Sequence, residues 1–212
     1  MFRISIPKYT LAEELINSIS HGIGALLSIP ALILMIIKAD TGKEIFLCTI
    51  FGTSMILLYT MSCIYHALAR NNGKKVLRVL DHCNVYLLVW GTYIPVTLLA
   101  VRGTLGWVLF GIVSLISVVG ITFSAINVDK FSVLEVVCHL INGWSIVFGI
   151  KSIIANVGTK GLLFMLIGGV LYSLGSRLYG VGSKVKYMHS IFHLFCLFGT
   201  LFHFLAIYLY VL

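Results

Sequence analysis

Two pairs of residues spaced four apart carry the chemistry that this sequence can support. His189 and His193, in YMHSIFHLF, are one helical turn apart, so on a helix both imidazole rings project from the same face. That spacing lets two imidazoles bind one metal ion, as in the zincin helix, although the glutamate of an HExxH motif is missing here. Ser62 and His66, in TMSCIYHALA, have the same spacing, and His66 offers a third nitrogen from a distant segment.

Three histidine ligands favour zinc with one open coordination position. Neutral imidazoles suit zinc, and three protein ligands with a fourth position left for water are typical of catalytic rather than structural zinc. We therefore expect one zinc ion bound by His66, His189 and His193. Asp81, in VLDHCNVY, would orient that water or accept its proton, and Ser62 would support a ligand or polarise a carbonyl. The alternative is a set of hydrogen-bonded interhelical residues, because such histidine pairs also occur without metal.

The segments that position these residues are apolar enough to cross a membrane. Of the 212 residues, 59% are hydrophobic and 10% charged, and the mean hydropathy is +1.05. Soluble domains are usually about half apolar and a quarter charged. A spanning helix needs about 20 apolar residues. Seven segments qualify, namely 17–39, 46–69, 79–101, 104–126, 132–154, 160–181 and 186–211. We predict an all-α, polytopic seven-helix bundle, with residues 1–16 as a short cytoplasmic segment and 17–212 as one transmembrane domain.

The basic residues between the spans predict the orientation. With the N-terminus in the cytoplasm, ten basic residues fall inside and five outside, which agrees with the positive-inside rule. The inside set is Arg3, Lys8, Arg70, Lys74, Lys75, Arg78, Lys130, Arg177, Lys184 and Lys186; the outside set is Lys38, Lys43, Arg102, Lys151 and Lys160. The C-terminus is then outside, the reverse of the G-protein-coupled receptors. Because the net charge of +8 is divided among these clusters, it indicates contact with lipid headgroups and no nucleic-acid partner.

This topology places the candidate site residues at one depth. His66 lies near the end of an inward-running span, whereas Asp81, His189 and His193 lie near the start of outward-running spans. At about 1.5 Å per residue, all of them fall within about two helical turns of the cytoplasmic face. Ionisable groups inside spans are costly, so each is a functional hypothesis by default.

The other intramembrane polar residues are expected to have structural roles. His203 lies about 15 Å beyond His193 along the helix, too far to share an ion. His82 is turned about 100° from Asp81 and should face another helix or the headgroups. His139, one turn after Glu135, would form an interhelical bond or line a water-filled cavity.

Residues outside these motifs add three further expectations. His21, in the cytoplasmic half of the first span, is an alternative supporting group for the metal site. The five cysteines lie in apolar segments without CxxC spacing, so we expect buried thiols rather than disulfides. The first 16 residues lack the apolar core of a cleavable signal peptide, so the first span should act as an uncleaved anchor.

Together these motifs resemble the hemolysin III branch of the PAQR (progestin and adiponectin receptor) family. The resemblance rests on Ser62-x3-His66, on the start of the third span from Asp81 to GTYIP, on His189-x3-His193, and on ELINSISHGIG and HFLAIYLYVL. It implies seven helices, a cytoplasmic N-terminus, and zinc bound by His66, His189 and His193, with Asp81 and Ser62 beside the metal-bound water. The short segment before the first span favours the bacterial members, and hence a bacterial inner membrane, over the receptor branch.

Three functions stay open at this point. The resemblance extends to the alkaline ceramidases, which suggests a zinc-dependent hydrolase of a lipid amide or ester near the cytoplasmic leaflet. A non-enzymatic regulator of membrane lipid or energy homeostasis would use the metal as a clamp between spans. A pore-forming hemolysin or channel is the third, although the spans lack a ring of charges suited to a filter. Membrane lipids are the expected partners in each case.

Overall fold

The computed structural model of the chain describes residues 4–182 and 184–212, and this part is helical with no strand. Arg3, one of the basic residues used to predict the orientation, lies outside the described residues. The helices are α1 (Leu11–Lys38), α2 (Gly42–Ala67), α3 (Asn72–Pro95), α4 (Gly103–Asn127), α5 (Ser132–Trp144), α6 (Ile150–Gly182) and α7 (Met188–Ala206). Short π-helical segments extend α3 (η1, Val96–Val101) and α7 (η3, Ile207–Val211), and a 3-10 segment (η2, Ser145–Gly149) joins α5 to α6.

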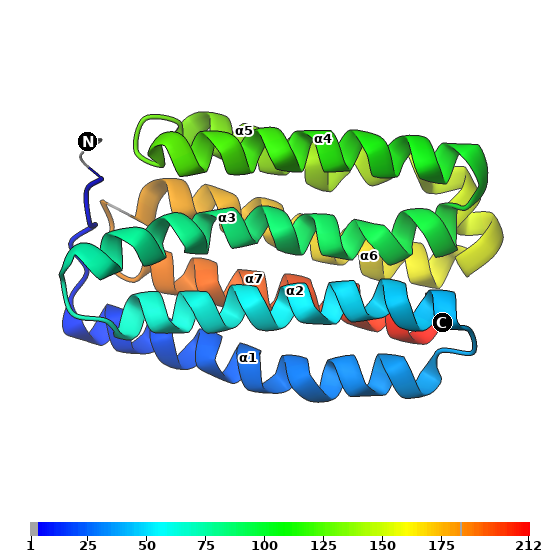
Figure 1. The fold of residues 1–212 in the computed structure, drawn as a ribbon, viewed down its shortest axis with the longest axis horizontal. Coiled ribbons are helices and arrows are strands. Elements are labelled where there is room, and N and C mark those ends of the chain that lie inside the picture. Colours follow the sequence, from blue (N-terminus) through cyan, green and yellow to red (C-terminus); the bar gives the residue numbers. More distant parts are fainter. Residues whose placement is uncertain (1–3, 183) are drawn as a thin grey trace.

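Six helical runs of the described chain are long and apolar enough to cross a membrane. The sequence predicted seven spans, and the difference lies in Ser132–Gly182, a run of 51 residues that contains two of them. Gly158 interrupts the helical geometry of this run, with φ 82° and ψ 170°, a conformation that glycine adopts without steric cost. Figure 1 shows α5 behind α4, with the run turning back at the right-hand end of the view before it continues along α6.

A capping box sets the start of α1. The Thr10 side chain accepts a hydrogen bond from the Glu13 backbone N–H at 3.3 Å, and the Glu13 carboxylate accepts one from the Thr10 N–H at 2.8 Å. The helix therefore starts at Leu11, ahead of position 17 where the apolar span was predicted to begin. As a result Glu13 and Glu14 are part of the first turn of α1, and their side chains lie at this end of the bundle.

The outer surface of the bundle is apolar. Leucine, isoleucine, valine and phenylalanine side chains are exposed along the helices, with Leu26 at 69%, Ile37 at 75% and Phe148 at 75%. By contrast, histidines, serines and several charged side chains are buried between the helices. This distribution suits a protein surrounded by lipid, in which polar groups must find partners inside the bundle.

Candidate metal centre

Three histidine side chains meet near the end of the bundle at which α1 and α7 begin. His66 comes from the last turn of α2, and His189 and His193 come from the first two turns of α7. Their candidate ligand atoms all lie within 4.8 Å of one another, and the three residues are only 2%, 6% and 1% exposed. The structure brings together the three histidines that the sequence singled out; their role as metal ligands stays a prediction.

The ring nitrogens of this histidine group fit a cation. His189 Nε2 and His193 Nε2 are 3.1 Å apart, whereas two nitrogens on one tetrahedral zinc would be about 3.3 Å apart. His66 Nε2 is buried and has no hydrogen-bond partner among the described residues. A buried polar atom without a partner destabilises the fold, and a cation shared by the three rings would give this atom one.

Glu14 orients His66, a role that the sequence motifs did not predict. Glu14 Oε2 lies 2.7 Å from His66 Nδ1, and Glu14 Oε1 accepts a hydrogen bond from Lys74 Nζ at 2.6 Å. A carboxylate oxygen accepts, so His66 Nδ1 carries the proton and the Nε2 lone pair is free for a metal. This is the carboxylate–histidine pairing that commonly supports metal ligands. The sequence contained a pattern that could have identified Glu14: the spacing of Glu14, Asn17 and His21 places all three on one face of α1.

His21 lies against the histidine group from α1. Its ring centroid is 3.8 Å from that of His193, and the residue is 4% exposed. Neither His21 nitrogen has a hydrogen-bond partner within the part of the chain that the structure describes. This close ring contact limits rotation of the His193 ring, so the position of His21 is compatible with the supporting role that the sequence suggested.

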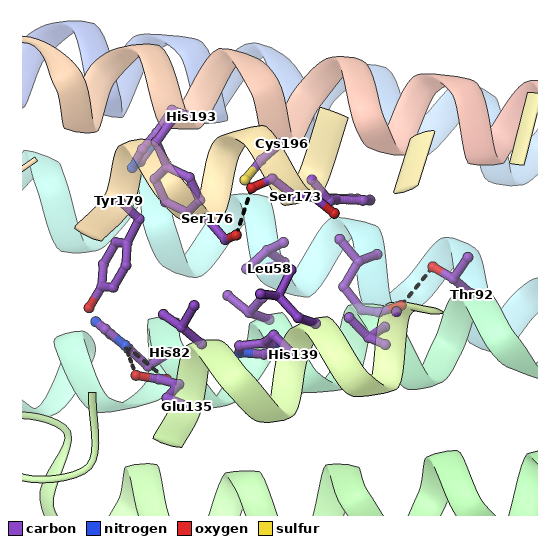
Figure 2. Close-up of a pocket in the computed structure, with 18 of the residues that line it drawn as sticks. Leu58, His82, Thr92, Glu135, His139, Ser173, Ser176, Tyr179, His193 and Cys196 are labelled. Carbon is purple, nitrogen blue, oxygen red and sulfur yellow. Dashed lines mark hydrogen bonds and ion pairs between the residues drawn. The ribbon is translucent and has the colours of Figure 1, made fainter. Parts of the chain in front are cut away.

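Ser62 and Asp81 lie beside the histidine group on the wall of one cavity. This cavity has a volume of about 150 Å³, and its lining includes Ser62, Asp81, His189 and His193. Ser62 is buried one turn before His66, whereas Asp81 is outside the compact group of potential ligands. Figure 2 shows His193 on one side of the cavity and the α5 residues on the other. Both predicted catalytic residues thus line the cavity that two of the three candidate ligands, His189 and His193, also line.

The remaining histidines line the same cavity but lie outside the compact group. His82 faces α5, where its Nδ1 is 3.0 Å from both carboxylate oxygens of Glu135. His139 stacks on Tyr86, with ring centroids 3.7 Å apart. His203 lies further along α7 and borders the cavity there. The five cysteines, all within the described residues, are free thiols.

The N-terminal strap, residues 5–9, covers the histidine group at this end of the bundle. Asp129 accepts hydrogen bonds from the Ser5 N–H at 2.7 Å and from Arg78 Nη1 at 2.6 Å, and Arg78 also donates to the Ser5 carbonyl. Arg70 donates to two further strap carbonyls at 2.8 and 2.9 Å. The Tyr9 ring stacks on His189 with centroids 4.7 Å apart. Burial raises the pKa of the Tyr9 hydroxyl, so this group stays neutral over that ring.

Replacing Asp129 with asparagine is expected to loosen the strap. Burial raises the pKa of Asp129, but the Ser5 N–H and the Arg78 guanidinium lower it more, so the net pKa is below its usual value. A carboxylate with a lowered pKa contributes stability above its unfolded pKa and loses that contribution as the pH falls through the folded pKa. The wild-type strap should therefore hold at neutral pH and loosen below about pH 4.

The measurement is the anisotropy of a fluorophore on Lys8→Cys, an exposed strap position. Lower anisotropy is expected at pH 7 for Asp129→Asn, and on acidification for the wild-type sequence. Lys130→Gln, a charge change at the next residue, should leave it unchanged. Equal anisotropy in Asp129→Asn and the parent would contradict the strap contacts.

Comparison with known proteins identifies the family. The family model described as "Haemolysin-III related" matches residues 9–204. This chain belongs to the haemolysin-III related family. Among the relatives of this family member is "Hemolysin-3" of Bacillus cereus, 40% identical over 203 residues, which are 94% of this chain and 92% of the relative. The "Hemolysin-3 homolog" of Bacillus subtilis (strain 168) is 38% identical over 205 residues, covering 95% and 96%.

A more distant relative extends the similarity beyond bacteria. The human "Monocyte to macrophage differentiation factor" is 25% identical over 213 residues, which cover 96% of this haemolysin-III related chain and 86% of the human protein. No solved structure matches the chain. These matches cover nearly the whole helical bundle rather than one motif, and together with the six apolar helical runs they make the protein a multi-pass membrane protein. The printed names of these relatives specify neither a metal nor a substrate.

Proposed function

We propose that this haemolysin-III related protein binds one zinc ion through His66, His189 and His193 and hydrolyses a lipid amide or ester. The observation that supports the proposal is the meeting of three buried imidazoles from α2 and α7 beside a cavity that two of them, His189 and His193, line together with Asp81 and Ser62. A lipid substrate suits a site enclosed by apolar helices, because the carbonyl of a membrane lipid lies at a depth in the bilayer comparable to that of the histidine group. A soluble substrate would not require such a site.

The proposal includes a topology of seven crossings with the N-terminus in the cytoplasm. A helix of about 20 residues is sufficient to cross the hydrocarbon core. The run Ser132–Gly182 has 51 residues, so it is long enough for two crossings, with the turn between them near Gly158. The ten-to-five distribution of basic residues favours this orientation. The histidine group then lies at the cytoplasmic leaflet of the cell membrane, which for a relative of the Bacillus proteins is the bacterial cytoplasmic membrane.

Each polar residue of the site has a distinct proposed role. When bound, zinc acts as a Lewis acid that polarises a carbonyl and lowers the pKa of water. Asp81 accepts a proton from the attacking water and returns it to the leaving amine or alcohol. Ser62 donates a hydrogen bond to the carbonyl oxygen, and Glu14 keeps the His66 ring in place. The apolar part of the cavity holds hydrocarbon.

Replacing Asp81 with asparagine tests the enzymatic proposal. Turnover of long-chain ceramides or related amides by purified protein should fall at least about a hundredfold, because a general base contributes about that much or more. Zinc content should stay near that of wild type, because Asp81 lies outside the histidine group. Asp40→Asn, at a loop position far from the site in sequence, is the matched control. Equal turnover in Asp81→Asn and wild type would rule out this mechanism.

A second candidate function is pore formation, which the printed names of the two Bacillus relatives favour. It predicts that wild-type protein releases dye from vesicles and that the substitution of all three histidines leaves the leakage unchanged. A regulator that uses the metal as a clamp predicts a third result, in which His66→Ala lowers Tm and no substrate is turned over.

A further inference from the structure

A second polar wall faces the cavity from the side opposite His193, and the proposed mechanism does not use it. Its centre is Glu135 of α5, which is 6% exposed. His82 Nδ1 lies 3.0 Å from both carboxylate oxygens, and Ser124 Oγ donates to Oε1 at 3.0 Å. Figure 2 shows the His82–Glu135 pair below the cavity and His193 above it, with Tyr179 between them.

The wall is held in place by contacts behind the carboxylate. The Tyr86 hydroxyl donates to the Glu135 backbone carbonyl at 3.0 Å, and the Tyr86 ring stacks on His139. His139 Nδ1 is buried without a hydrogen-bond partner among the described residues, and His139 also lines the cavity. An ionised carboxylate offers about four acceptor positions, so His82 and Ser124 leave capacity for another donor.

A purely structural pair is a poor explanation for this wall. Burying two ionisable groups within a span is expensive, and such a pair contributes little net stability. A pair that only joins two helices also has no need to border a cavity, whereas both His82 and Glu135 do. These features are instead typical of a binding site, in which a few convergent polar groups fix the orientation of a mostly apolar ligand.

The second wall lies within reach of a ligand bound at the histidine group. The Tyr179 ring contacts both sides, with its centroid 5.8 Å from that of His82 and 6.0 Å from that of His189. One aromatic ring therefore separates the two polar groups. A lipid whose carbonyl lies at the histidine group can place a neighbouring substituent at Glu135.

We infer that Glu135 and His82 bind the hydrogen-bond donor of a lipid headgroup, an ammonium or hydroxyl group, while the apolar lining holds its chain. The carboxylate attracts a donor and repels an anionic headgroup. The inference rests on the proposed function in assigning the lipid amide class, and it adds the subsite at which the hydrogen-bond donor of that lipid binds. Binding at this wall does not itself require zinc.

The test is equilibrium binding of tritiated sphinganine, a long-chain amino alcohol, to purified protein in detergent. Wild-type protein should bind it, and unlabelled octadecanoic acid, an anion of equal chain length, should compete at least about tenfold less well than unlabelled sphinganine. Glu135→Gln should weaken binding about tenfold or more, because a hydrogen bond to a charged group is lost. Thr92→Val is the matched control, because Thr92 borders the cavity and already donates to the Leu88 carbonyl at 2.7 Å. It should bind as wild type does.

The results separate this inference from the proposed function. Equal competition by the fatty acid, no binding at all, or unchanged affinity in Glu135→Gln would each overturn the inference. The competition measurement uses wild-type protein only, so it still decides if Glu135→Gln does not fold. If His189→Ala/His193→Ala still binds sphinganine and wild type turns over no amide, the hydrolase proposal is rejected and the binding role of Glu135 and His82 is kept. If wild type turns over amides but does not bind sphinganine selectively, the hydrolase proposal is kept and the binding role is rejected.

Discussion

Protein with both His189→Ala and His193→Ala is expected to contain no bound zinc, against about one ion per chain in wild type. The double substitution removes two of three ligands, and the single ligand that is left, His66, cannot hold the ion against the hydration of zinc in solution. Metal analysis by mass spectrometry, after purification in zinc-replete medium and desalting, gives the stoichiometry. A zinc-dependent rise in Tm should be seen for wild type and be absent from the variant.

His203→Ala is the matched control for this experiment. His203 is on the same helix and lines the same cavity, but it is outside the compact group of candidate ligands. Its loss should leave the zinc content unchanged. Wild-type protein that carries no metal, or a double variant that carries as much as wild type, would reject the metal centre.

Glu14→Ala is expected to destabilise the protein by about 3–5 kcal/mol, because it leaves a buried ammonium group without its counter-charge. Lys74 is 2% exposed, and its Nζ lies 2.6 Å from the Glu14 carboxylate. Adding Lys74→Met should recover most of this loss, since the second substitution removes the unpaired charge. Thermal unfolding in detergent, compared among wild type, both single variants and the double variant, gives the coupling between the two residues.

The zinc affinity of the same proteins distinguishes positioning from stability. Both Glu14→Ala and Glu14→Ala/Lys74→Met should bind zinc about 10–100 times more weakly, because His66 loses the acceptor that fixes its ring. Lys75→Met, at the neighbouring position, is the control and should change neither Tm nor affinity. Full recovery of zinc affinity in the double variant would show that Glu14 acts only through Lys74.

The convergence of the three histidines was predictable because two independent patterns agreed. Spacing of four residues places His189 and His193 on one helix face, and the distribution of lysine and arginine puts His66 at the same depth. Neither pattern depends on how the helices are rotated about their axes. The pairing of His82 with Glu135 does depend on that rotation, which is set by side-chain packing that hydropathy does not describe.

Glu14 was missed for a different reason. The predicted first span began where the apolar run begins, so Glu13 and Glu14 were assigned to a preceding cytoplasmic segment. The Thr10-x-x-Glu13 capping box, which was visible in the sequence, starts the helix earlier and brings Glu14 to His66. The difference between six apolar runs and seven predicted spans has a similar origin, because helical hydrogen bonding continues close to Gly158 where the apolar pattern breaks.

The strap over His189 also bears on which small molecules can act on this protein. A polar drug or chelator that arrives from the aqueous side has to displace the Tyr9 ring and the hydrogen bonds that Arg70, Arg78 and Asp129 make to the strap. Compounds that reach the cavity from the bilayer do not have to displace the strap. Potency against this protein should therefore follow partitioning into lipid more closely than affinity for zinc in water.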